Sequence, residues 1–223
     1  MSLKHLEPLS PGRMPITEPF EEHIDRYEEW FEVHDAAYAS ELSAVRDLLP
    51  EEGRGLEIGV GSGRFAGPLG LDVGIDPAPT MLANARERGV EVAVGVAEAL
   101  PFRDGSFDAA LIVTTICFVD DVPATLEEAR RVLAPDGRLV IGFVDKESPL
   151  GQHYQDKREE NPFYRDATFL STGELESAMR AAGFGDIAFR QTIFENPGGM
   201  TAPEEPREGH GDGSFVVIAA TPD

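Results

Sequence analysis

The spacing of apolar residues divides the chain into a helical N-terminal part and a following alternation of strands and helices. Between residues 20 and 49, apolar and aromatic side chains recur every three or four positions, which predicts a helical stretch ended by Pro50 and Gly53. Short β-branched runs follow, separated by helical segments. We expect strands at 55–60, 71–75, 90–95, 107–119 and 138–144, and helices from Arg64 and at 80–88 and 122–133.

Strands that alternate with helices predict parallel βαβ units, so the fold class is α/β with a Rossmann-like doubly wound sheet. Residues 187–194 and 214–220 read as two closing strands with no helix between them, which indicates antiparallel neighbours. We therefore expect seven strands, mostly parallel with an antiparallel last strand, in a single domain over residues 1–223. Its parts are an N-terminal arm and helix (1–49), a core (50–145), a polar, irregular cap insert (146–170), and a C-terminal helix with the closing strands (171–223).

Composition narrows the function classes. The 223 residues are 41% hydrophobic and 27% charged, which is typical of a soluble globular protein. A net charge of −22 repels phosphate backbones and anionic membranes, and it argues against nucleic-acid and membrane partners. A single cysteine, Cys117, forms no internal disulfide. We expect a cytoplasmic monomer or homodimer.

The sharpest chemical signal is a glycine-rich segment, Leu56–Gly63, at the end of the first expected strand. Glycines there let backbone N–H groups approach a ligand closely, and the following helix N-terminus favours negative charge. The spacing Gly61-x-Gly63-x-x-Ala66 also fits a dinucleotide-binding loop. The segment alone therefore leaves the nucleotide cofactor open.

Three further segments accompany this loop in order along the chain: Gly74–Leu82, Val96–Asp108 and Arg131–Leu139. Together with Leu56–Gly63, they resemble the motifs of class I S-adenosylmethionine-dependent methyltransferases. The similarity is to the small-molecule branch, near the quinone-biosynthesis methyltransferases with a methyltransferase type 11 domain. It extends over residues 55–144, which are thus expected to form the cofactor-binding core.

The resemblance implies a site for S-adenosylmethionine and its product S-adenosylhomocysteine. Asp76 is expected to accept hydrogen bonds from both ribose hydroxyls, and Glu57 to help hold the methionine end. Ala97 and Glu98 stand at the adenine edge, where Val96 departs from the family's frequent Asp. The implied cofactor residues are Glu57, Gly59, Gly61, Gly63, Asp76, Pro77, Met81, Ala97, Glu98, Leu100 and Thr114.

The implied reaction is in-line methyl transfer to a small-molecule acceptor, in which the protein aligns the reactants and excludes water. No catalytic residue is assigned. The loop after the fourth strand lacks the (D/N)-P-P-(Y/F) signature of amino-methylating DNA and protein enzymes. Two alternatives remain: a non-catalytic S-adenosylmethionine-binding module, and an NAD-dependent oxidoreductase. The second lacks a Tyr-x-x-x-Lys pair, since Tyr154 and Lys157 stand one position too close.

Several residues have a structural interpretation beside the functional one. Asp76 before Pro77 could cap the next helix, and Cys117 is expected to be a core residue. Tyr27, Trp30, Phe31 and Tyr38 fit a cofactor lid or plain packing equally well. His34 and His153 are placed where a base would be useful, yet a surface or supporting position is expected for each. No metal-ligand spacing occurs, so no metal is expected.

Overall fold

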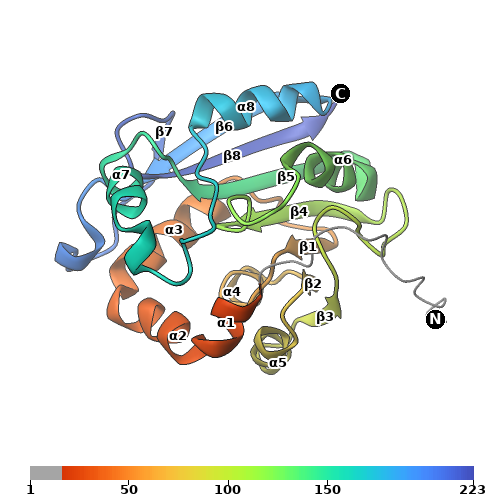
Figure 1. Ribbon diagram of the computed structural model, residues 1–223. Helices are drawn as coiled ribbons and strands as arrows, with labels where there is room; N and C mark the ends of the chain where they lie inside the picture. Colours follow the sequence, from red (N-terminus) through yellow and green to blue (C-terminus); the bar gives the residue numbers. More distant parts are fainter. Residues whose placement is uncertain (1–16) are drawn as a thin grey trace.

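The computed structural model describes residues 17–223, and its centre is an eight-stranded sheet ordered β3-β2-β1-β4-β5-β8-β6-β7 (Figure 1). The strands are β1 (Gly55–Ile58), β2 (Val73–Asp76), β3 (Glu91–Val94), β4 (Phe107–Val113), β5 (Leu133–Val144), β6 (Phe184–Thr192), β7 (Arg207–Glu208) and β8 (Phe215–Pro222). The α-helices are α1 (Glu18–Glu22), α2 (Ile24–Val33), α3 (Asp35–Arg46), α4 (Ala66–Leu69), α5 (Pro79–Glu87), α6 (Val122–Val132), α7 (Pro149–Asp156) and α8 (Thr172–Ala181). Two short 3-10 turns, η1 (Arg158–Glu160) and η2 (Pro197–Gly199), complete the elements.

The pairing confirms a mostly parallel sheet with an antiparallel last strand. Strands β3, β2, β1, β4 and β5 pair in parallel, and β8 is antiparallel to both β5 and β6. The expected count of seven strands is one too low, because the two-residue β7 pairs with the end of β6. β4 ends at Val113 rather than at residue 119, since Thr114 adopts a φ of 50° that turns the chain out of the sheet.

The two faces of the sheet bury alternate side chains, as the period of a strand requires. Ile112, Ile141 and Ile218 pack in one cluster with residues of α6 and α8. Their neighbours Leu111, Val140 and Val217 pack in another cluster with α2 and α3. Helices thus cover both faces, so strands buried on both sides appear as continuous apolar runs in the sequence.

The N-terminal helical stretch is divided into three helices, α1, α2 and α3, where the sequence pattern predicts one stretch. The breaks lie at His23 and His34, whose ψ angles of 30° and 42° redirect the axis. The segment at 145–170 is likewise more ordered than expected, since it contains α7 and η1. Helix α8 begins with a capping box, in which the Ser171 side chain accepts a hydrogen bond from the Glu174 nitrogen.

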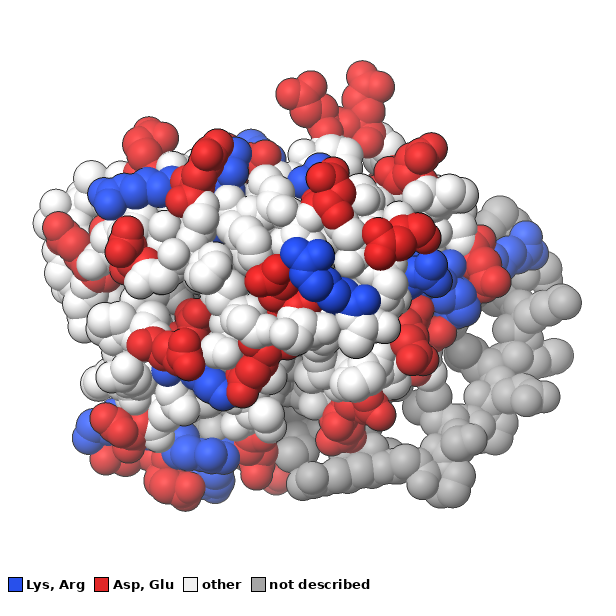
Figure 2. All heavy atoms as spheres, turned by 90° about the horizontal axis from the view of Figure 1, so that it is seen from above, with Lys and Arg blue, Asp and Glu red and all other residues white. Residues whose placement is uncertain are grey.

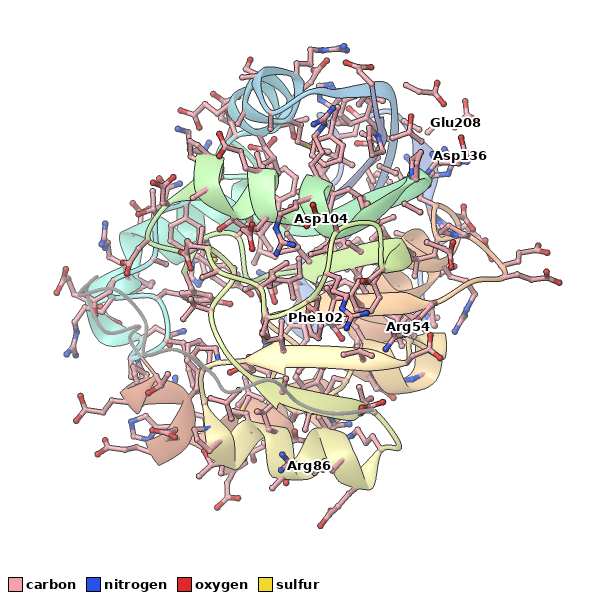
Figure 3. All side chains as sticks on the ribbon, turned by 90° about the vertical axis from the view of Figure 1, so that its right-hand side faces the viewer. Arg54, Arg86, Phe102, Asp104, Asp136 and Glu208 are labelled. Carbon is pink, nitrogen blue, oxygen red and sulfur yellow. The ribbon has the colours of Figure 1, made fainter. Side chains whose placement is uncertain are left out.

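Polar side chains lie at the amino-terminal ends of the parallel strands (Figure 3). The Arg54 guanidinium lies over the Phe107 ring at 4.9 Å, and Asp104 pairs with Arg131 at 2.8 Å. Figure 2 shows one face of the molecule, on which acidic side chains are spread among fewer basic ones. Within residues 17–223, no helix is both long enough and apolar enough to span a membrane. Most of the arm at 1–19 lies outside the described residues.

Candidate functional site

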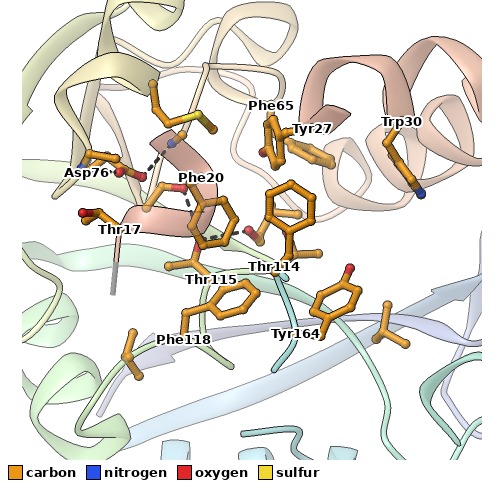
Figure 4. A pocket seen from close by; sticks show the side chains of 18 of the residues that line it. Thr17, Phe20, Tyr27, Trp30, Phe65, Asp76, Thr114, Thr115, Phe118 and Tyr164 are labelled. Carbon is orange, nitrogen blue, oxygen red and sulfur yellow. Dashed lines mark hydrogen bonds between the residues drawn. The ribbon is translucent and has the colours of Figure 1, made fainter. Parts of the chain in front are cut away.

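A cavity of about 1110 Å³ lies at the carboxyl ends of β1, β2 and β4 (Figure 4). Gly59, Asp76 and Thr114, which follow or end these three strands, all line it. Open α/β sheets bind ligands at this edge. Residues of α1, α2, α3 and α7 line the cavity opposite the strands. The volume exceeds the usual range of small-molecule pockets, about 300–1000 Å³, and leaves room for two ligands.

The glycine loop after β1 takes a conformation that only glycine holds without strain. Gly59 has a φ of 75° and Gly61 a φ of 50°. A Cβ on Gly59 would lie 2.2 Å from the Thr115 side chain, so the loop packs directly against the segment after β4. The loop therefore presents bare backbone to the cavity at the point where β1 ends.

Asp76, the last residue of β2, is held by two backbone donors. Its Oδ2 accepts a hydrogen bond from the Gly61 nitrogen at 2.9 Å, and its Oδ1 accepts from the Ala78 nitrogen at 2.8 Å. Burial raises the pKa of Asp76, and these two hydrogen bonds oppose the rise. The N-cap of α5 is Ala78, so Asp76 does not cap that helix. Its carboxyl group instead orders the glycine loop and lines the cavity.

Eight of the eleven cofactor residues expected from the sequence line this cavity: Gly59, Gly61, Asp76, Pro77, Met81, Ala97, Glu98 and Thr114. The other three do not. Glu57 is buried beneath the loop, where its Oε2 accepts from the Ala66 nitrogen at 2.7 Å, and burial raises its pKa well above the ordinary range. Gly63 faces Ala85 of α5, and Leu100 lies in the core below the site.

Glu98 lines the cavity, but its carboxylate is engaged elsewhere. Its Oε1 accepts from the backbone nitrogen of Asp120 at 2.8 Å, near the end of the loop between β4 and α6. Val96, Ala97 and Ala99, which flank Glu98, also line the cavity and carry no polar side-chain atom. This arrangement favours backbone contacts at the position where Val96 replaces an acidic residue.

Aromatic side chains from distant parts of the chain form the opposite wall (Figure 4). Phe20 of α1 packs against Phe118 and Phe163, with ring centroids 5.2 Å and 5.3 Å away. Tyr154 and Tyr164 stack with centroids 4.8 Å apart. The aromatic residues lining the cavity are Phe20, Tyr27, Trp30, Phe31, Phe65, Phe118, Tyr154, Phe163 and Tyr164. Of the lid candidates, Tyr27, Trp30 and Phe31 line the cavity, whereas Tyr38 packs in the core cluster beside Phe65.

Helix α2 is fastened to the loop region by ion pairs. The Glu28 carboxylate contacts Arg64, which follows the glycine loop, and lies 2.7 Å from Nη2 of Arg88. The Glu28 and Arg64 side chains are each only 18% exposed, so water weakens their attraction less than at an open surface. These contacts hold the aromatic residues of α2 over the cavity.

The two histidines noted in the sequence both line the cavity, His34 at the break before α3 and His153 on α7. Cys117 does not line it. Its thiol donates to the Thr114 carbonyl at 3.4 Å, and burial raises its pKa to about 12, so it is a poor nucleophile. Within residues 17–223, no three His, Cys, Asp or Glu side chains are grouped to hold a metal ion.

Sequence reasoning missed Glu41, Phe118 and the turn at Asn196–Gly198, all of which line the cavity. One signal was available for Glu41. It follows Tyr38 by three positions and His34 by seven, so it is an acidic residue on the apolar face of its helix. Nothing in the local sequence marks Asn196–Gly198, which reaches the cavity from the connector between β6 and β8.

The fold and the site define a Rossmann-like α/β protein that binds its ligand at the carboxyl edge of the sheet. Residues 56–141 match the family model described as "Methyltransferase domain". A crystal structure from Thermotoga maritima, described as a SAM-dependent methyltransferase and possible histamine N-methyltransferase, is 50% identical with a TM-score of 0.91. That match covers 93% of this chain and 100% of the other.

Two curated proteins are also similar in sequence to this chain. An uncharacterised protein of Methanocaldococcus jannaschii is 40% identical over 90% of this chain and 97% of its own length. A ubiquinone biosynthesis O-methyltransferase of Azorhizobium caulinodans is 33% identical over 68% of this chain and 66% of its own. The chain belongs to the class I S-adenosylmethionine-dependent methyltransferases, and its cofactor is S-adenosylmethionine. The dinucleotide interpretation of Gly61–Ala66 is therefore set aside.

The side chains and backbone groups that line the cavity suit this cofactor chemically. Asp76 offers carboxylate oxygens at the end of β2, suited to a vicinal diol. Gly59 and Gly61 line the cavity with backbone alone, and a Cβ would meet Thr115 at Gly59 and come within 3.3 Å of the Tyr27 hydroxyl at Gly61. Apolar Ile75 and Met81 line the space between them, where a flat ring can pack. These residues supply the polar and apolar contacts that an adenosyl group requires.

Proposed function

We propose that this protein transfers the methyl group of S-adenosylmethionine to a small organic acceptor held in the same cavity. The observation that carries the proposal is the division of the cavity into two unlike walls. The strand ends present Gly59, Gly61 and Asp76, whereas α1, α2, α7 and the residues after α7 present aromatic side chains. One wall suits the cofactor and the other suits an acceptor.

On the cofactor side, Asp76 binds the ribose hydroxyls, and Gly59 and Gly61 admit the methionine end. The backbone of Ala97 and Glu98 meets the adenine edge, while Pro77, Met81 and Thr114 complete the lining. Glu57 acts indirectly, because its carboxyl group fixes the Ala66 nitrogen below the loop. Support for these roles comes from the motif positions and from the lining of the cavity.

The bound cofactor supplies an electrophilic methyl group on a sulfonium, so the chain needs chiefly to hold the acceptor in line and to exclude water. The aromatic wall serves both purposes. Phe20, Phe118 and Phe163 pack edge to face or tilted over the cavity and replace water with apolar contact. The N-terminal helices and residues 146–170 thereby act as a cap on a single domain.

The acceptor itself is small under this proposal. The cavity lies within one chain and beneath aromatic residues, which favours a compact organic molecule over a polymer. The Thermotoga relative is described as a possible histamine N-methyltransferase, and the Azorhizobium relative as a ubiquinone biosynthesis O-methyltransferase. Since those acceptors differ in charge and size, the cavity of this chain, rather than the family, must decide the acceptor class.

Calorimetric titration with S-adenosylhomocysteine, and separately with NAD, tests the cofactor side. We expect binding of the first only. Release of S-adenosylhomocysteine from S-adenosylmethionine in the presence of a panel of amines, phenols, thiols and carboxylic acids then tests turnover. Binding without product release for every acceptor class would favour a non-catalytic S-adenosylmethionine-binding module, and binding of NAD alone would overturn the proposal.

A further inference from the structure

Glu41 of α3 is a buried acid that faces the cavity and has no hydrogen-bond or ion-pair partner among the described residues. It is 6% exposed and lines the cavity. Among residues 17–223, no hydrogen bond or ion pair reaches its carboxyl group, whereas Asp76 and Glu28, the comparable acids nearby, each have two or more. The carboxyl group of Glu41 therefore keeps its hydrogen-bonding capacity free toward the cavity, where a ligand can use it.

No Lys or Arg among residues 17–223 forms an ion pair with Glu41. Burial raises the pKa of Glu41 to about 8, and no neighbouring charge contributes to this shift. Tyr154 of α7 also lines the cavity, and burial, followed by the charge of Glu41, raises its pKa to about 12. A cation bound between α3 and α7 would lower the cost of ionising Glu41.

The lining of the cavity as a whole favours a cation. Its acidic residues are Glu41, Asp76, Glu98 and Asp120, against a single Arg or Lys, Arg26. The Arg26 guanidinium lies 5.8 Å over the Phe163 ring, away from any pairing with Glu41. Trp30, Tyr154 and Tyr164 add π-faces, which attract an organic cation more strongly than a neutral group.

We propose that the methyl acceptor carries a protonated amino group and that the Glu41 carboxylate binds it. The acceptor is therefore a small organic amine, held between Glu41 and the aromatic wall. This inference rests on the proposed function and names its substrate class. A bound cation favours the ionised form of Glu41, whereas a carboxylate or phosphate acceptor would disfavour it and a neutral alcohol would gain no ion pair.

Three probes that share a phenethyl group test the proposal on the full chain saturated with S-adenosylhomocysteine: phenethylamine, phenethyl alcohol and hydrocinnamate. A charge-assisted hydrogen bond predicts that the amine binds about 10- to 100-fold more tightly than the alcohol, with the anion weakest. Equal binding of amine and alcohol, or no detectable amine binding, would overturn the proposal. Failure of S-adenosylhomocysteine itself to bind would instead overturn the proposed function.

Glu41→Gln, which keeps the shape and removes the charge, assigns the preference to this residue. We expect the ratio of amine to alcohol affinity to fall close to one while the affinity for S-adenosylhomocysteine stays unchanged. Glu29→Gln is the matched control, because Glu29 lies exposed on α2 and does not line the cavity. An unchanged ratio in Glu41→Gln would contradict the proposal. Should that variant fail to fold, the probe series on the unmodified chain still decides.

Discussion

The Asp76 carboxylate accepts a hydrogen bond from the backbone nitrogen of Gly61 at 2.9 Å, so the end of β2 is joined directly to the loop after β1. Two features of the sequence that lie 15 residues apart thereby become one structural unit. A carboxylate has about four lone-pair positions, and backbone donors occupy only two of those of Asp76. The others remain for a ligand in the cavity.

The first prediction concerns this carboxylate. Asp76→Asn replaces one oxygen with a donor, so it removes a charge-assisted acceptor from the ribose position. We expect the affinity for S-adenosylhomocysteine, measured by calorimetry, to fall about 10- to 100-fold.

Asp72→Asn is its control, since Asp72 also accepts from a backbone nitrogen, that of Gly55 at 2.8 Å, but does not line the cavity. Equal losses in the two variants would mean that the effect is structural and that Asp76 is not a cofactor ligand.

The second prediction separates backbone strain from close packing in the glycine loop. Gly59 and Gly70 have nearly the same φ, 75° and 73°. A Cβ would meet Thr115 at Gly59, but would meet nothing within 4 Å at Gly70. Gly70→Ala should cost about 1 kcal/mol in the free energy of unfolding, and Gly59→Ala about 1–3 kcal/mol more. Urea denaturation measures both, and equal costs would exclude the close approach to Thr115.

The third prediction tests the ion pairs that hold α2 over the cavity. Glu28→Gln removes the charge shared by Arg64 and Arg88, and we expect the free energy of unfolding to fall by about 1–3 kcal/mol. Glu32→Gln is the matched control, because that side chain is 75% exposed and 3.8 Å from Arg64, so its loss should be below about 1 kcal/mol. Similar values for the two variants would show that α2 is held mainly by its apolar contacts.

The fourth prediction is a pH dependence caused by Glu41. Its pKa is about 8 in the folded chain against an ordinary value of 4.5, so below pH 4.5 both states hold the proton. Between these values the unfolded chain releases its proton while the folded chain keeps it. Rising pH therefore favours unfolding, by an amount on the order of a few kcal/mol that levels off above the folded-state pKa.

Glu41→Gln removes this titration. The variant should match the original chain below about pH 4.5 and exceed it in stability increasingly as the pH rises from about 4.5 to about 8, when denaturation is followed at a series of pH values. Glu29→Gln should keep the original dependence. A parallel pH profile for Glu41→Gln and the original chain would show that the Glu41 carboxyl group titrates as an ordinary exposed acid.

The features that could be predicted from the sequence are those set by local chemistry. Alternating strands and helices fix a parallel sheet, and parallel strands bring their carboxyl ends to one edge, so Gly59 and Asp76 had to lie together. Eight of eleven expected cofactor residues line the cavity for this reason. The exceptions have a common cause. The motif gives the position of Glu57 and Leu100 along the chain, but burial turned one beneath the loop and the other into the core.

The family, the sheet and the strand-end half of the site could be predicted from the sequence, because each depends on short segments with their own backbone preferences. The other half of the site depends on tertiary packing. Glu41 and Tyr154 stand more than a hundred positions apart, and their relation depends on how α3 and α7 pack around the sheet edge. The helix breaks at His23 and His34 also could not be predicted, because the helical spacing of apolar residues continues through both positions. Packing between distant elements leaves no periodic signal along the chain, so the acceptor wall appears only in three dimensions.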